Sequence, residues 1–280
     1  MKLIRYGNYG FERPALIDSQ GGIRDLSSRI RDVSSDTLNQ ESLAQLASIP
    51  IEDLPRVSSG VRLGACVADV GKFICVGLNY LDHVRETGAA VPAEPVLFMK
   101  ATSCIAGPSD AIIIPPGASM VDWEVELGVV IGSLAKNVSV HQALNYVAGY
   151  CVVNDISERG WQLQGTGQWV KGKSADGFGP IGPWLVTRDE IGDPQNLRLW
   201  LSVNDKMRQN SSTGQMIFPV NTLVSYISKF MTLKPGDIIA TGTPPGVALG
   251  AKPAVYLKPG DSVKLGIEGL GEQTQTVRES

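Results

Sequence analysis

The feature that most constrains the fold is a series of short apolar runs, separated by Gly- and Pro-rich turns, that begins at Lys72. Clear examples are KFICVGL, EPVLFMK, AIIIPP, WEVELGVVIG, YVAGYCVVN and DIIATG. Runs of this length between such turns are typical of β-strands. Amphipathic helical stretches are few, notably VHQALNYV and PVNTLVSYISKF. The pattern predicts an α+β, β-dominated fold and not a regular alternation of strand and helix.

The first part of the chain has a different character. MKLIRYG and ALIDS resemble strands, and SDTLNQESLAQLASI indicates a helix with Ser35 or Asp36 as its N-cap. The stretch over residues 50–64 is rich in Pro, Ser and Gly and is typical of a linker. We therefore predict a small N-terminal α/β domain over residues 1–65 and a larger domain over residues 66–280.

Composition excludes several classes of partner. The net charge is -3, so the chain has no basic excess for a nucleic-acid backbone. No apolar run approaches the ~20 residues that a membrane span needs, and the first residues do not resemble a signal peptide. No Gly-rich nucleotide-binding motif follows a strand.

The four cysteines form no C-x-x-C pair, which favours buried free thiols and a cytoplasmic location.

The most informative segment is DWEVELGVVIG, because side chains alternate between the two faces of a strand. Glu124 and Glu126 then share one face. Two adjacent carboxylates beside a core are costly unless a cation compensates them, and Mg²⁺ and Ca²⁺ prefer such oxygen ligands. The alternative is a solvated polar face at a sheet edge. Asp155 follows the apolar run YCVVN and is a candidate third member of the site; it could also be the N-cap of a helix that begins at Ile156, and both roles could hold at once through different oxygens.

Of the two histidines, His141 lies in a polar helix start and is predicted to be a surface residue. His83 lies in GLNYLDHVRE, where Glu86 follows three positions later on the same helical face. A carboxylate beside an imidazole orients it as a general base for water requires. The alternative is an ordinary solvated surface pair.

Two further positions could contact a substrate. Lys173, in KGKSADGFGP, could stabilise a developing oxyanion or could lie in water on a loop. Lys100 ends the run VLFMK and is noted without a role. The turn ATGTPPG follows a strand and could present the hydroxyl of Thr243 to a carboxylate, or could be only a structural turn.

Taken together and in order across residues 73–270, these segments resemble the fumarylacetoacetate hydrolase family. The matching pieces are GLNYLDHVRE, EPVLFMK, DWEVELGVVIG, YCVVNDISERGWQ, KGKSADGFGPIGPW, MIFP and ATGTPPGV. The resemblance implies a mixed β-roll with flanking helices, usually a homodimer, that binds Mg²⁺, with Mn²⁺ or Ca²⁺ as substitutes. Its substrate would be a small 2-oxo acid.

The resemblance also implies roles for individual residues. It assigns metal binding to Glu124, Glu126 and Asp155, water activation on a mobile lid to His83 and Glu86, oxyanion stabilisation to Lys173, and substrate contacts to Arg159, Gln162 and Thr243. The lid would extend over residues 80–91. Gly160 and Ala175 depart from residues that relatives often carry, which affects substrate scope more than metal binding.

The activity that the resemblance implies first is hydrolysis of a C–C bond in a 2,4-dioxo acid, with release of pyruvate. The substrate would be an acylpyruvate or a 2,4-diketo-3-deoxy sugar acid, such as the rhamnonate or fuconate derivative. The alternatives are oxaloacetate decarboxylation or tautomerisation, ureidoglycolate lysis, and a catalytically silent metal-binding protein.

Overall fold

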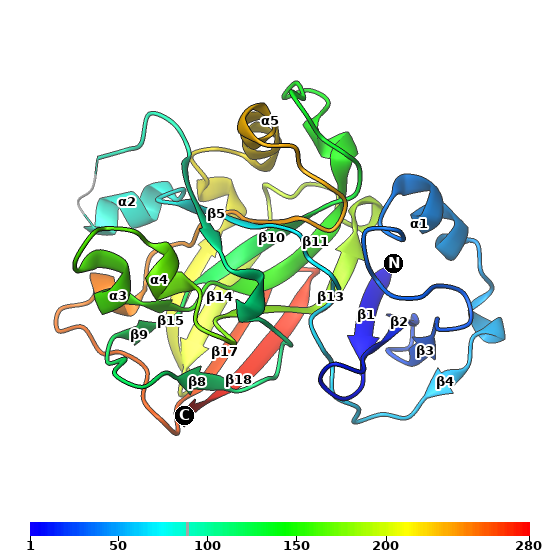
Figure 1. Cartoon of the computed structure of the whole chain (residues 1–280), viewed down its shortest axis with the longest axis horizontal. Coiled ribbons are helices and arrows are strands. Elements are labelled where there is room, and N and C mark those ends of the chain that lie inside the picture. The colour runs from blue at the N-terminus through cyan, green and yellow to red at the C-terminus, as the bar shows by residue number, and fades with distance from the viewer. Residues whose placement is uncertain (88–89) are drawn as a thin grey trace.

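The computed structural model describes residues 1–87 and 90–280, so Gly88 and Ala89 of the predicted lid lie outside the described residues. The strands are β1 (Lys2–Tyr6), β2 (Arg13–Ile17), β3 (Ile23–Asp25), β4 (Arg56–Val57), β5 (Phe73–Gly77), β6 (Val96–Lys100), β7 (Ile105–Ala106), β8 (Ile112–Ile114), β9 (Val121–Asp122), β10 (Val125–Ile131), β11 (Val147–Asn154), β12 (Ser157–Glu158), β13 (Gly179–Thr187), β14 (Arg198–Val203), β15 (Lys206–Ser212), β16 (Ile238–Ala240), β17 (Ser262–Ile267) and β18 (Gly271–Glu279). The α-helices are α1 (Gln40–Ala47), α2 (Leu81–Thr87), α3 (Arg159–Leu163), α4 (Val170–Lys173) and α5 (Val220–Phe230) (Figure 1).

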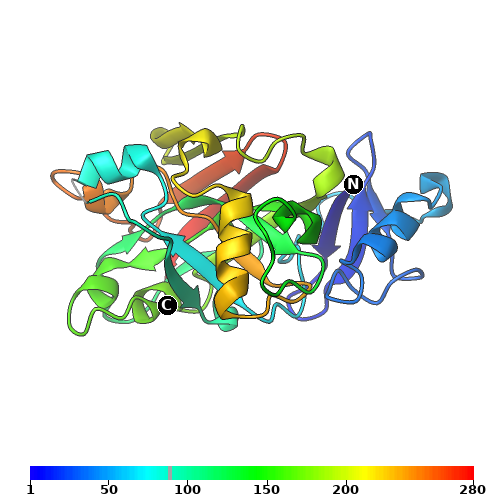
Figure 2. The ribbon, with the colours of Figure 1, turned by 90° about the horizontal axis from the view of Figure 1, so that it is seen from above.

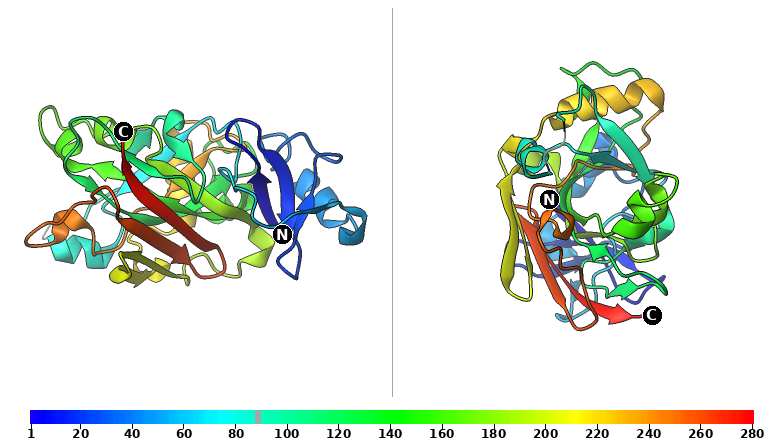
Figure 3. Two further views of the ribbon diagram at one scale, coloured as in Figure 1. Left: turned by 90° about the horizontal axis from the view of Figure 1, so that it is seen from below. Right: turned by 90° about the vertical axis from the view of Figure 1, so that its left-hand side faces the viewer.

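Two mixed sheets and a short strand pair organise the described part of the chain. The large sheet has the order β4-β3-β2-β1-β13-β11-β10-β16-β5-β6, and β7 pairs in parallel with β13. The smaller sheet has the order β15-β14-β17-β18-β8, and β12 pairs with β9. The smaller sheet lies against the large one, as the yellow and red strands beside the green strands show (Figure 3). The predicted β-dominated α+β fold is confirmed.

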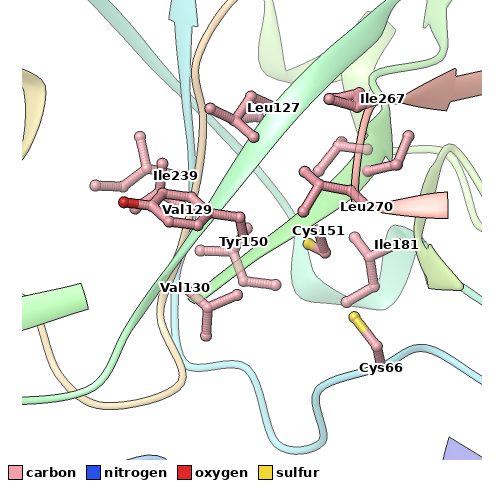
Figure 4. Packing of buried hydrophobic residues seen from close by; sticks show 14 of the residues in the cluster. Cys66, Leu127, Val129, Val130, Tyr150, Cys151, Ile181, Ile239, Ile267 and Leu270 are labelled. Carbon is pink, nitrogen blue, oxygen red and sulfur yellow. The ribbon is translucent and has the colours of Figure 1, made fainter. Parts of the chain in front are cut away.

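The core lies between these two sheets. Every residue of β10 and β11 is buried, as expected for strands that are apolar on both faces. Their side chains, including Leu127 and Tyr150, gather with Ile267 from the smaller sheet and with Leu270 just after it (Figure 4). The four cysteines are buried and free, as predicted. This buried central pair of strands therefore fixes the positions of the residues at its ends.

The N-terminal unit occupies one end of the elongated molecule (Figures 1 and 2). Its sheet is continuous with the rest of the fold, because β1 pairs antiparallel with β13 through Lys2 opposite Val186 and Leu3 opposite Leu185. The domain boundary at residue 65 stays a prediction.

The helices correct two local predictions. The N-cap of α1 is Asn39, whose side chain accepts from the Ser42 N–H, and not Ser35 or Asp36. The reason is that Thr37 closes a separate turn with Ser34 before the helix begins. The stretch after His141 forms only a short 3₁₀ helix at Ala143–Tyr146, whereas α5 forms as predicted. None of the helices in the described ranges is long and apolar enough to span a membrane.

Candidate metal centre and active site

The register of two central strands brings the predicted acids together. In the antiparallel pair β10–β11, Val125 lies opposite Asn154 and Glu126 opposite Val153. Glu124 stands just before β10 and Asp155 just after β11, and the Asp155 N–H donates to the Glu124 carbonyl at 2.9 Å. Residues 29 or more positions apart in sequence therefore meet at one end of the pair.

The three acids form one buried cluster. Each of Glu124, Glu126 and Asp155 offers a carboxylate oxygen, and these oxygens lie within 4.8 Å of one another. Glu124 is 6% exposed, Glu126 2% and Asp155 0%. The alternative of a solvated sheet edge is therefore wrong. The N-cap alternative for Asp155 is also wrong, because Glu158 caps α3 and accepts from the Trp161 N–H.

Three buried cations surround the cluster. Lys173 Nζ lies 2.7 Å from Glu124 Oε2 and 2.6 Å from Asp155 Oδ2. Arg159 Nη2 donates to Glu124 Oε1 at 2.6 Å. Lys100 Nζ lies 2.6 Å from Asp155 Oδ1 and also donates to the Ile156 carbonyl. Lys173 is only 2% exposed, so the alternative of a lysine in water on a loop is wrong.

The environment of the cluster shifts the pKa values of Glu124 and Glu126 in opposite directions. Burial alone would raise the pKa of Glu124, but the ammonium of Lys173 and the guanidinium of Arg159 hold this pKa at about 2. Burial raises the pKa of Glu126 well above its ordinary value, and the carboxylates of Asp155 and Glu124 raise it further. No lysine or arginine in the described ranges lies within ion-pair distance of Glu126.

The donor set fits a divalent cation. Three buried carboxylates at this spacing are the hard oxygen ligands that Mg²⁺, Mn²⁺ and Ca²⁺ accept. Glu126 supplies a second observation, because its carboxylate is buried without an ion-pair partner among the described residues and accepts only a backbone hydrogen bond, from Gly242 N–H at 2.8 Å. Gly242 has a φ of 101°, and a Cβ there would lie 2.8 Å from the Cβ of Asn79, so glycine is needed at this contact.

His83 and Glu86 form the predicted pair on α2. His83 Nδ1 lies 3.3 Å from Glu86 Oε2, and the Gly246 N–H donates to Glu86 at 3.2 Å. His83 is 9% exposed, which differs from the fully solvated alternative. His141 is exposed, as predicted.

A cavity of about 230 Å³ connects these groups. Its wall includes seven of the nine residues proposed from the sequence, namely His83, Glu124, Glu126, Arg159, Gln162, Lys173 and Thr243. Asp155, which is fully buried, and Glu86, which contacts His83, are not part of this lining. The Thr243 hydroxyl already makes two hydrogen bonds within the protein: it donates to the Val125 carbonyl at 3.0 Å and accepts from Gln209 Nε2 at 2.8 Å.

Sequence reasoning gave no role to three residues that build the site. Asp122 accepts from Arg159 Nε at 2.8 Å and from the N–H groups of Ala248 and Leu249. Its spacing of two from Glu124 was a usable signal, because the strand pattern places both on one face. Lys100 was visible as a charge at the end of an apolar run. Gln209, which holds Thr243 and the N–H of Val125, carried no signal.

Comparison with known proteins identifies the class. The family model for the fumarylacetoacetate (FAA) hydrolase C-terminal domain matches residues 72–278, so the chain belongs to this family. A Burkholderia orbicola protein is 58% identical over 279 residues, which cover 99% of each chain; its name gives only an unconfirmed hydrolase activity and no substrate.

Two solved structures extend the likeness to the whole fold. The fumarylacetoacetate hydrolase of Exiguobacterium antarcticum has a TM-score of 0.88 and 36% identity, with 100% of both chains covered. The maleylpyruvate hydrolase of Sphingobium sp. SYK-6, solved with manganese(II) and pyruvate, has a TM-score of 0.85 and 27% identity, again with 100% of both chains covered. The family and the β-roll predicted from the sequence are thus confirmed.

Proposed function

We propose that the chain is a divalent-metal-dependent hydrolase that cleaves a C–C bond of a 2,4-dioxo acid and releases pyruvate. The observation that carries this proposal is that His83, held by Glu86, lines the same cavity as Glu124 and Glu126. A base for water and a carboxylate cluster for a cation then face one substrate. The manganese and pyruvate held by the Sphingobium maleylpyruvate hydrolase support the choice of metal and product.

The acids would hold the metal ion. Glu124, Glu126 and Asp155 supply its oxygen ligands, and we propose Mg²⁺ as the resident ion, with Mn²⁺ or Ca²⁺ as substitutes. When bound, such an ion acts as a Lewis acid toward the 2-oxo carboxylate end of the substrate. Lys100 pairs with Asp155 and Arg159 with Glu124, which holds these two carboxylates in place.

The remaining steps belong to the side chains. Glu86 accepts from Nδ1–H of His83, which leaves the basic lone pair on Nε2. His83 takes a proton from water, and the water oxygen forms a bond to C4 of the substrate. The π electrons of the C4 carbonyl move to its oxygen and re-form the double bond as the C3–C4 bond breaks. The electron pair of the broken bond stays on C3, and the proton that His83 took from water is delivered there to give pyruvate. The other product is the carboxylic acid that contains C4.

Lys173 is placed to assist this step. Its two hydrogen bonds to described residues use two of its three N–H donors, so a third donor can meet the negative charge that develops on oxygen. Burial alone would lower the pKa of Lys173, but Asp155 and Glu124 raise it, so the ammonium stays charged.

We also propose a homodimer, which sedimentation velocity would test.

The experiment is metal-dependent release of pyruvate from a panel of 2,4-dioxo acids, with oxaloacetate and ureidoglycolate as comparison substrates. We expect pyruvate and the matching carboxylic acid in equal amounts, and loss of both when the metal is chelated. The same rate after exhaustive chelation would contradict the proposal, as would turnover confined to oxaloacetate or ureidoglycolate.

A further inference from the structure

The cavity has two unlike parts. Its charged part is formed by Glu124, Glu126, Arg159 and Lys173, whereas the rest of the lining is largely apolar. The apolar residues that matter here are Leu78, Phe98, Leu163, Trp169, Val247 and Leu249. Phe98 joins the two parts, because its ring centroid lies 5.0 Å from Lys173 Nζ and 5.2 Å from the ring of Trp169.

Trp169 is fixed as part of the wall. Its ring meets Phe98 edge to face, with an interplanar angle of 62°. It also packs closely against Gly77, where an added Cβ would come within 2.6 Å of Trp169 Cζ3. A side chain at position 77 would therefore displace the indole ring. The glycine and the tryptophan together build a flat apolar surface beside the charged floor.

Two leucines on the same wall are left open to solvent. Leu163 is 47% exposed and Leu249 is 39% exposed, and both line the cavity. Single exposed leucines are common on protein surfaces. Two of them beside a tryptophan in one cavity form a surface that an apolar group of a ligand would cover, with gain from the apolar area removed from water.

Two polar side chains of the cavity, Arg159 and Thr243, already have hydrogen-bond partners among the described residues. Arg159 donates through Nε to Asp122, through Nη1 to Gln162 and through Nη2 to Glu124. The hydroxyl hydrogen of Thr243 points to a backbone carbonyl. Hydroxyl groups on a part of the substrate that lies against Leu163 and Leu249 would lose their hydration without gaining hydrogen bonds from these side chains.

We propose that the acyl group of the substrate, the part beyond C4, is an apolar alkyl or aryl group and not a polyhydroxylated sugar chain. Leu163, Trp169 and Leu249 would set this preference. The inference rests on the proposed function, in which the carboxylate cluster fixes the 2-oxo acid end. It narrows the two substrate classes of that function to the acylpyruvates.

The first test is kinetic. We expect kcat/KM for 2,4-dioxooctanoate to exceed that for 2,4-dioxopentanoate by at least about tenfold, since one methylene in a hydrophobic pocket is worth about 10-fold or more. We expect 2,4-dioxohexanoate to exceed its 5,6-dihydroxy counterpart by about the same factor. Equal values, or a preference for the dihydroxy acid, would overturn the inference.

Variants connect the preference to the wall. Leu163→Ser and Leu249→Ser should each reduce the ratio of kcat/KM between the eight-carbon and the five-carbon acid by about 3- to 10-fold. Phe230→Ser is the matched control, because Phe230 is 61% exposed on α5 and does not line the cavity. It should leave the ratio unchanged. A ratio that the two leucine variants do not alter would remove these residues from the proposal.

A binding measurement separates this inference from the proposed function. The probes are 2-oxohexanoate and 3-deoxy-2-oxogluconate, six-carbon acids that differ only in three hydroxyl groups and lack the 4-oxo group that hydrolysis needs. Calorimetry with Mg²⁺ present should give a Kd at least about tenfold lower for 2-oxohexanoate. If no dioxo acid is hydrolysed but this difference is found, the proposed function fails while the apolar preference of the cavity stands. Equal or tighter binding of the hydroxylated acid overturns the inference whatever the kinetics show.

Discussion

Lys173 and Asp155 form an ion pair that is almost fully excluded from solvent, with Nζ 2.6 Å from Oδ2 and side-chain exposures of 2% and 0%. The same ammonium lies 2.7 Å from Glu124, so one cation separates two of the three carboxylates. A buried pair of this kind is costly to break, because water does not replace the lost cation and Asp155 then keeps only Lys100 and Glu124 only Arg159 as ion-pair partners among the described residues. The acid cluster therefore depends on Lys173 before any metal or substrate arrives.

Replacing this lysine should destabilise the fold. Lys173→Met removes the cation and leaves Glu124 and Asp155 facing each other, so we expect the free energy of unfolding of the metal-free protein to fall by about 3–5 kcal/mol at pH 7. Urea denaturation measures this free energy of unfolding. Lys264→Met is the control, because Lys264 pairs with Asp205 in solvent, and it should change stability little. An equal change in the free energy of unfolding in the two variants would mean that the buried pair stabilises the fold no more than the exposed pair does.

The metal site depends most clearly on Glu126. We expect Glu126→Gln to weaken Mg²⁺ or Mn²⁺ binding by more than about 100-fold, since even residues that only support ligands are worth about 10–100-fold. Calorimetric titration measures the affinity. Asp205→Asn is the matched control, because this carboxylate is exposed and pairs with Lys264, which is not part of the acid cluster. Unchanged affinity in Glu126→Gln would refute the assignment of this residue as a ligand.

The pKa of Glu126 predicts a pH dependence of metal binding. Burial and the neighbouring carboxylates raise the pKa of Glu126, so the folded, metal-free protein keeps it protonated at pH values where a free glutamate is ionised. A metal ligand must be deprotonated, so binding releases this proton and affinity rises with pH up to the raised pKa. Titrations between pH 5 and pH 9 should show that rise. Affinity independent of pH would contradict it.

The same pKa shifts give the sign for stability without metal. The contribution of protonated Glu126 is fully present below its unfolded-state pKa and is lost as the pH rises through the raised folded-state pKa. Glu124 behaves oppositely. Its pKa is lowered to about 2, so its contribution is present above the ordinary glutamate pKa and is lost as the pH falls toward about 2.

Part of the site could be predicted from local pattern alone. Glu124 and Glu126 share a face because the strand period is two, and His83 and Glu86 share one because the helical spacing is three. Both statements need only a few consecutive residues. The β-dominated fold was equally readable from the short apolar runs, and so was α5 from its amphipathic pattern.

What the sequence could not supply were the long-range partners. The local sequence around Lys173 was compatible with a site residue or with a lysine in water on a loop, and α4 carries it into the cluster. The pairing of Lys100 with Asp155 depends on how β6 and β11 are placed in one sheet, which no local pattern encodes. The N-cap of α1 was missed because several capping residues stand close together, and Thr37 closes a turn with Ser34 before the helix begins.

Water activation by His83 separates hydrolysis from decarboxylation. Loss of a general base typically costs about 10²–10⁴-fold, so His83→Ala should lose diketone hydrolysis by that order. Any oxaloacetate decarboxylation should fall much less, because carbon dioxide leaves without an attacking water. Glu86→Gln should lie between, since the imidazole stays but loses its orienting charge. Steady-state kinetics of the variants on both substrates decide it. Wild-type hydrolysis by His83→Ala would place the decarboxylase or tautomerase alternative first.

The central claim is that water is added to C4 of a 2,4-dioxo acid in a metal-dependent reaction, and isotope labelling tests it most directly. The wild-type protein with Mg²⁺ is incubated briefly with an acylpyruvate in H₂¹⁸O, and both products are analysed by mass spectrometry against a sample without protein. The account predicts pyruvate and one equivalent of a carboxylic acid that carries ¹⁸O from the solvent in its carboxylate. Formation of carbon dioxide in place of that acid, or an acid without the label, would contradict it.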